Sequence, residues 1–208
     1  MITMFQYNQD SAITSGESSY INQSGAYVGR ITAAKWINAR QSQAQALELS
    51  FESQNGQKAN FISLYHTKAD GSPNAYGIAH INAIMGLTGL QALTNIPKGS
   101  DNICPELINK PIGFVLQKVL FNKANGEESY KFELIFPYGA KTGKTLKEAV
   151  NNEPAERVNQ VIATLHDKDE RDKSQGAPQS SAPQPPQRQA TQPATALPVD
   201  DIDDDIPF

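Results

Sequence analysis

Hydrophobic and polar positions alternate most clearly over residues 45–53. Large apolar side chains there alternate with Glu and Ser, which is the period of a β-strand with one buried face. Asn55-Gly56 follows and is typical of a tight two-residue hairpin turn. We therefore expect residues 57–67 to return as the second strand of a hairpin.

The returning strand carries apolar side chains on both faces. Phe61 and Tyr65 fall on one face, and Ile62 and Leu64 fall on the other. A strand of a small domain needs only one face for the core. We expect the second face to meet another strand, an arm of the chain or a ligand.

Similar patterns predict the other elements of the folded part. An apolar run predicts a first strand bent near Gly29, and two later runs are joined by an Asn-Gly turn. Helical spacing of apolar residues, broken near Gly86 and Gly89, predicts a helix between the early and late strands. The expected strands are 25–38, 45–53, 57–67, 112–122 and 128–138; the expected helix is 76–95, and a loop is expected at 96–110.

Three strands, a helix and two strands follow one another in this prediction. That is the layout of an OB-fold-like five-stranded barrel with a helix between strands 3 and 4, so we expect a mainly β protein of this kind. In OB-folds the second and third strands and their flanking loops bind oligonucleotides. A β-sandwich or another small barrel is the alternative.

The remainder of the chain has a different composition. An apolar stripe predicts a helix over residues 154–168, which docks on the barrel or pairs with another subunit. A segment rich in Pro and Gln cannot bury enough apolar surface to offset its ordering entropy, so we expect a disordered tail. The expected division is a binding domain at 1–150, a linker with a short helix at 151–173, a tether at 174–199 and an acidic tip at 200–208.

The net charge of −4 is unevenly distributed along the chain. Residues 1–150 carry 13 Lys and Arg against 11 Asp and Glu, whereas residues 200–208 contain five Asp. A nucleic-acid-binding domain is usually clearly basic. Charge alone therefore does not favour nucleic-acid binding, although a groove lined by Lys and aromatic residues is compatible with a neutral body.

The acidic tip combines negative charge with an apolar end and a terminal carboxylate, which suits a peptide ligand. The chain ends on Asp203, Asp204, Asp205, Ile206, Pro207 and Phe208. These six residues resemble the C-terminal tip of bacterial single-stranded DNA-binding proteins, and the body resembles, more weakly, the diverged single-stranded DNA-binding proteins of bacterial viruses. In that family the tip recruits replication, recombination and repair proteins and competes with DNA for the binding groove. The family's homotetramer is not implied, so a homo-oligomer stays open.

Single-strand binders combine aromatic side chains that stack on bases with cations that follow the phosphates. Tyr130, Phe132 and Phe136 alternate with charged residues, so we expect them in the core instead. The candidate stacking residues are Trp36, Phe61, Tyr65, Tyr76 and Phe121. The candidate phosphate contacts are Arg30, Lys35, Arg40, Lys58, Lys118, Lys123 and Lys131.

Catalytic and metal-binding patterns are weak. Residues 138–145 end in Gly-Lys-Thr like a phosphate-binding loop, but Tyr138 stands where that loop needs glycine. Residues 86–89 resemble a nucleotide-clamping Gly-x-x-Gly loop, but a helix end explains them better. The lone Cys104 and three His do not cluster. We expect neither an enzyme nor a cofactor or metal.

The sequence shows no secretory signal pattern and no apolar run near the roughly 18 residues of a membrane span. We therefore expect a protein of the bacterial cytoplasm, encoded by the cell or by a virus, that contacts no membrane. The predicted function is to bind and protect single-stranded DNA and to recruit partners through the tip. Two alternatives remain: an adaptor or inhibitor that binds a protein with its body and mimics the host tip, and a strand-annealing recombination protein.

Overall fold

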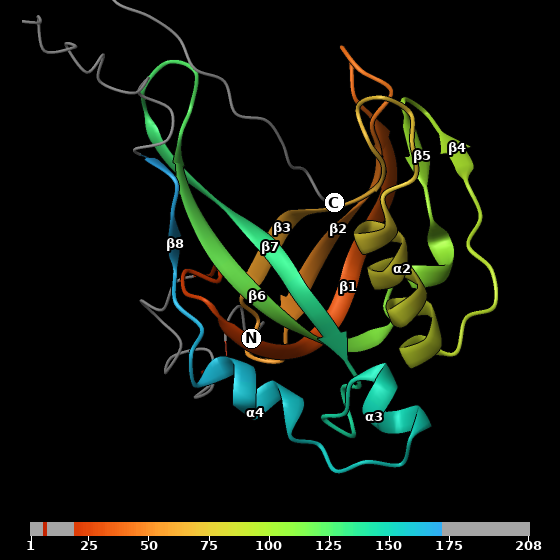
Figure 1. Ribbon diagram of the computed structural model, residues 1–208, viewed down its shortest axis with the longest axis vertical. Coiled ribbons are helices and arrows are strands. Elements are labelled where there is room, and N and C mark those ends of the chain that lie inside the picture. Colours follow the sequence, from red (N-terminus) through yellow and green to blue (C-terminus); the bar gives the residue numbers. More distant parts are fainter. Residues whose placement is uncertain (1–5, 8–18, 172–208) are drawn as a thin grey trace, which may run out of the picture. The chain divides into compact units, whose positions relative to one another are not determined.

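The computed structural model describes residues 6–7 and 19–171 of the 208-residue chain (Figure 1). The predicted tether and acidic tip lie outside the described residues. The helices are α2 (Ala75–Thr88), the short 3₁₀ helix η1 (Pro105–Leu107), α3 (Leu146–Val150) and α4 (Arg157–Ile162). The strands are β1 (Gly25–Asn38), β2 (Gln45–Ser53), β3 (Lys58–Thr67), β4 (Ile96–Lys98), β5 (Asp101–Ile103), β6 (Pro111–Asn122), β7 (Glu128–Tyr138) and β8 (Lys168–Asp169).

β1 is the central strand of the sheet. One edge of β1 pairs antiparallel with β2, which pairs with β3. The other edge is shared, because its first half pairs with β6 and its second half with β5. β7 extends the sheet beyond β6, and β4 extends it beyond β5. The five long strands therefore follow the order β3-β2-β1-β6-β7.

The sheet is open, because β3 pairs only with β2 among the named strands and β7 pairs only with β6. We call the gap between the facing edges of β3 and β7 the seam. The expectation of a mainly β fold is confirmed, and the five long strands begin and end within one residue of their predicted limits.

The core lies on the inner face of the strands. Leu49 and Phe51 of β2 are fully buried, and the Phe51 ring lies 5.0 Å from the ring of Phe114 on β6. Burying a side chain of this size contributes roughly 1.5–3 kcal/mol. Ile62 and Leu64 of β3 are also buried whereas Phe61 and Tyr65 are exposed, so the predicted separation of the two faces of this strand is confirmed, and the face of Ile62 and Leu64 is the one that joins the core.

Three segments differ from the sequence prediction. The expected loop at 96–110 contains β4, β5 and η1, since β5 pairs with the second half of β1. α2 ends at Thr88, because Gly89 adopts the left-handed conformation and caps the helix. α4 is shorter than the predicted helix at 154–168, and the chain after it forms β8, which pairs with β6.

None of the helices in the described part of the chain is both long and apolar enough to cross a membrane.

Candidate nucleic-acid interface

α2 is seated on β3 at one end of the seam. Gly77 faces the carbonyl oxygen of Tyr65, and a Cβ atom at Gly77 would lie 1.8 Å from that oxygen. Only a glycine therefore allows this helix to approach the strand so closely.

The same end of α2 is bonded to β7. Tyr76 Oη donates a hydrogen bond to the Leu134 carbonyl oxygen at 3.2 Å. The buried His80 ring places Nε2 2.9 Å from the Ile135 carbonyl oxygen and Nδ1 2.8 Å from the Tyr76 carbonyl oxygen. Both His80 contacts are hydrogen bonds only when both ring nitrogens carry a proton. α2 thus connects β3 to β7 where the strands do not pair.

Beyond α2 the seam is hollowed into two adjoining depressions. The first, of about 360 Å³, lies between β3, β7 and the first turn of α2. The second, of about 240 Å³, lies between β3, β7 and the chain around Tyr20. Phe61, Lys131 and Phe132 line both hollows. We call the two hollows together the seam groove.

Exposed aromatic side chains are concentrated in the seam groove. Six aromatic residues are exposed in the described part of the chain, and only Tyr7 lies outside the groove. Because exposed aromatic rings are costly to hydrate, their concentration in one concave site indicates a ligand surface. The five groove residues, with their exposed fractions, are Tyr20 (49%), Phe61 (73%), Tyr65 (47%), Tyr76 (61%) and Tyr130 (45%).

Phe61 has an unusual backbone conformation, with φ of +60°. The pairing of β2 with β3 shifts here, because Leu49 opposes Ile62 and Phe51 opposes Ala59, which leaves one extra residue in β3. Such a bulge redirects a side chain. The Phe61 side chain accordingly lies in the groove, while its neighbour Ile62 is fully buried.

The charge of the groove is modest. Lys131 lies in it and forms an ion pair with Glu133, Nζ to Oε1 2.8 Å. Lys58 lines the other hollow and has no carboxylate at ion-pair distance among the described residues. Two lysines are therefore available to phosphates, one of them in competition with a carboxylate.

The structure brings together five of the twelve predicted DNA-binding residues and separates the others. Phe61, Tyr65, Tyr76, Lys58 and Lys131 line the groove. The remaining seven, which line neither hollow, are Trp36, Phe121, Arg30, Lys35, Arg40, Lys118 and Lys123.

Trp36 and Phe121 are both partly buried. The Trp36 indole N–H donates to the Thr94 carbonyl oxygen at 2.9 Å, and its ring packs edge-on against His66 at 5.5 Å. Stacking a base on Trp36 would require these contacts to open. Phe121 is on β6, opposite Ser129 of β7.

Three of the predicted phosphate contacts that lie outside the groove form ion pairs with carboxylates elsewhere on the protein. Their partners are Glu52 for Arg30 at 2.7 Å, Asp101 for Lys35 at 2.8 Å, and Glu127 for Lys123 at 3.2 Å. Arg40 is exposed in the β1–β2 loop.

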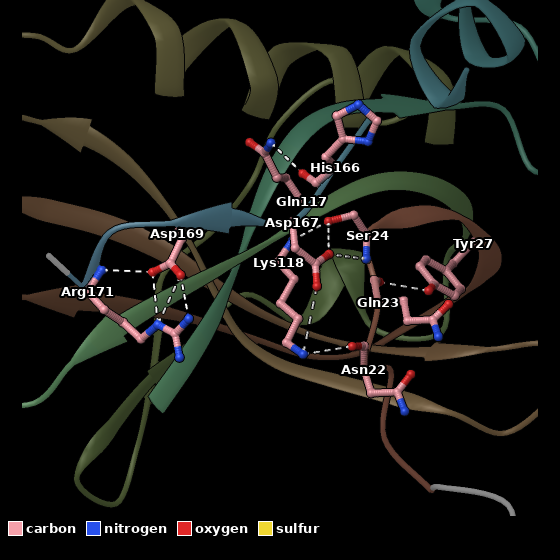
Figure 2. A network of polar contacts seen from close by, with 10 residues as sticks. All are labelled: Asn22, Gln23, Ser24, Tyr27, Gln117, Lys118, His166, Asp167, Asp169 and Arg171. Atoms are coloured by element: carbon pink, nitrogen blue, oxygen red, sulfur yellow. Dashed lines mark hydrogen bonds and ion pairs between the residues drawn. The ribbon is translucent and has the colours of Figure 1, made fainter. Parts of the chain in front are cut away.

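Lys118 belongs to a polar network that fixes the chain after α4 to β6 (Figure 2). Its Nζ donates to the Asn22 carbonyl oxygen at 3.0 Å and lies 3.9 Å from Asp167 Oδ2. Asp167 Oδ1 accepts from the Ser24 hydroxyl at 2.6 Å and from the Ser24 N–H at 3.0 Å. The Ser24 hydroxyl, more than the other contacts, lowers the pKa of Asp167.

Lys118 also connects this network to the groove. Its Nζ lies 5.0 Å from the centre of the Tyr130 ring, within the range of a cation–π contact. Lys118 therefore contacts a groove aromatic without itself lining the groove.

Two groove residues, Tyr20 and Tyr130, are absent from the sequence-based candidates. The alternation of β7 predicts Tyr130 in the core, and this prediction is wrong: Tyr130 lies nearer the hairpin turn than the core extends, whereas Phe132 is buried. Its nearness to the turn was the available signal. Tyr20 is brought beside β3 by backbone bonds of Lys58 with Ser19 and Ile21, both 2.9 Å.

Within the residues that the structure describes, no group of three or more His, Cys, Asp or Glu is placed to hold a metal ion. Comparisons with known proteins identify no relative: no protein-family model matches the chain, and no curated protein matches it.

Proposed function

We propose that the chain binds single-stranded DNA in the seam groove. The observation that carries this proposal is the gathering of five of the six exposed aromatic residues of the described chain along one concave seam. Aromatic rings stack on any base, and each stacked base contributes about 1–3 kcal/mol. A groove with many rings and few lysines suits ligands whose bases are unpaired.

The fold supports this assignment as an OB-fold-like architecture. The order β3-β2-β1-β6-β7, with α2 between the third and fourth long strands, is compatible with a five-stranded barrel left open between β3 and β7. OB-folds are partly open barrels that bind oligonucleotides around their second and third strands. Phe61 and Tyr65 belong to the third strand here.

The acidic tip adds a second part to the proposed function. Residues 203–208 resemble the family tip that recruits replication, recombination and repair proteins, and they lie outside the described residues. We propose that the tip recruits such partners to DNA held by the body.

A titration of fluorescently labelled oligo-dT with the full chain at low salt tests the DNA proposal. We expect saturable binding that Tyr65→Ala weakens about 5- to 100-fold, because one stacked base is lost. Tyr7→Ala removes an exposed aromatic that lies outside the groove and should leave the affinity unchanged. Equal losses in both variants would contradict a site in the seam.

One observation favours an adaptor as the second candidate. Of the seven predicted phosphate contacts, five form ion pairs with carboxylates: Arg30, Lys35, Lys118, Lys123 and Lys131. A surface neutralised in this way also suits a protein partner. Absence of oligo-dT binding at low salt would favour the adaptor.

A further inference from the structure

Phe61 stands at the junction of the two hollows. Its side chain lines both, and it is the most exposed of the five groove aromatics. Tyr65 and Tyr76 lie in the hollow on one side, and Tyr20 and Tyr130 lie in the hollow on the other. A strand that occupies both hollows must pass the boundary that Phe61 shares with Lys131 and Phe132.

The backbone of Phe61 is strained to reach this place. A bulky L-residue rarely adopts a φ of +60°, because its Cβ crowds the neighbouring carbonyl oxygen. Such conformations persist where the surrounding structure enforces them, and they cluster at ligand-binding sites. Here the enforcing structure is the bulge of β3, held on both sides by the buried Ala59 and Ile62.

We propose that Phe61 acts as a wedge. The bound strand passes from one hollow to the other, and the Phe61 ring enters between two consecutive bases and interrupts their stacking. This inference rests on the proposed function and adds to it that the groove holds bases in two groups, separated at one step. Apolar side chains that enter between bases are an established way of unstacking them.

A flat platform is the simpler role for an exposed phenylalanine. A platform needs open space above one face of the ring and does not require a hollow on each side. Phe61 lines two hollows, and each of these contains two further exposed aromatic residues. The arrangement therefore suits a ring that has bases on both of its faces.

The variant Phe61→Gly distinguishes a role of the Phe61 side chain in DNA binding from a role in the stability of the fold. Glycine adopts a φ of +60° without strain, and the side chain removed is 73% exposed. We expect the melting temperature to stay equal or rise and the affinity for oligo-dT to fall about 10- to 100-fold, the loss of stacking on one or two bases. A melting temperature that falls together with the affinity would overturn this assignment, since Phe61 would then be a structural residue.

A dimer of 2-aminopurine reports directly on the separated step. It is placed at each successive step of the shortest oligo-dT that binds the full chain tightly, and its exciton-coupled circular dichroism measures stacking of the two probes. We expect the signal to be lost at one central step with the natural protein and to persist with Phe61→Gly. The Tyr76→Ala protein is the control. It should bind the oligonucleotide more weakly, but at saturating protein the exciton signal at that step should still be lost, because Phe61 is present.

The outcomes of this experiment separate the two proposals. If the natural protein does not bind oligo-dT, both proposals fail. If it binds and the exciton signal survives at every step, the wedge is wrong while DNA binding in the groove stands.

Discussion

At the scale of single residues, the groove depends on the exposed side chain of Phe61 and on the lack of a side chain at Gly77. Phe61 is turned outward by a bulge, and Gly77 allows α2 to seat against the Tyr65 carbonyl oxygen. The sequence already placed Phe61 and Tyr65 on a face separate from Ile62 and Leu64, and their exposure confirms this. The left-handed backbone of Phe61 was not predictable, because it arises from pairing with β2 and not from local sequence.

Replacing Gly77 with alanine tests the seat of α2. The added Cβ would lie 1.8 Å from the Tyr65 carbonyl oxygen, so the helix must shift away from β3. We expect Gly77→Ala to lower the free energy of unfolding by about 1–3 kcal/mol, the usual cost of overpacking. Chemical denaturation measures this change. Ala79→Ser, on an exposed position of the same helix, should have little effect.

If Gly77→Ala were as stable as the natural protein, α2 could not be in close contact with β3. The groove would then be wider than described, and the position of Tyr76 would need revision.

At the scale of elements, the sequence predicted what local patterns determine. Alternation and Asn-Gly turns located the five long strands, because both signals act within a few residues. Leu90 and Leu93 continued the helical spacing past Gly89, yet they pack against the core without being helical. β4 and β5 have three residues each, too few to show a period, and their pairing depends on distant β1.

The short helices α3 and α4 are joined through one buried carboxylate. Glu148 Oε2 accepts from the Thr145 N–H at 2.7 Å and from its hydroxyl at 2.8 Å, which completes a capping box. Glu148 Oε1 accepts from the N–H groups of Glu156 and Arg157, at 3.0 and 2.8 Å. Burial alone would raise the pKa of Glu148, but these hydrogen bonds outweigh it and lower the pKa to about 2.

Glu148→Gln should therefore destabilise the protein in a pH-dependent way. The folded pKa is below the unfolded value of about 4.3, so the ionised carboxylate stabilises the fold above that pH, and the stabilisation is lost as the pH falls towards 2. At neutral pH we expect a loss of about 1–3 kcal/mol, typical of hydrogen bonds to a charged group. Thermal unfolding at several pH values measures it, with Glu153→Gln, an exposed neighbour, as control. A stability difference that persisted unchanged at pH 2 would contradict the role of the charge.

At the scale of the whole molecule, charge and topology together determine how DNA would be held. The sequence indicated a nearly neutral body, and the ion pairs of the described residues show how its cations are neutralised. The sequence did not predict the open seam, because the seam exists where two strands far apart in the chain, β3 and β7, do not pair with each other. The succession of the five long strands along the chain and the place of α2 between the third and fourth of them were predictable, whereas the position of the groove was not.

The salt dependence of the proposed DNA binding would report how many phosphates the groove neutralises. Among the described residues, Lys58 and Lys131 are the cations that line the groove, so a plot of log affinity against log salt should have a slope of roughly −1.4, at about −0.7 per phosphate. Deleting residues 200–208 removes five Asp, so the truncated chain should bind equally or more tightly at low salt and converge with the full chain at high salt. A much steeper slope would show that other cations take part. Loss of binding on truncation would contradict a tip that serves only partners.

The pairing of β1 with β6 also affects how the chain is made. Gly25 pairs with Leu116, so β6, which pairs with the first half of β1, is synthesised long after β1 itself. At about 5–20 residues per second, the roughly 55 residues between the end of β3 and the end of β6 take about 3–11 s to synthesise, during which the β1–β2–β3 meander has the β6-pairing edge of β1 unpaired. An open edge of this kind pairs readily with other chains. Correct folding of the nascent protein should therefore depend on protection of that edge until β6 emerges.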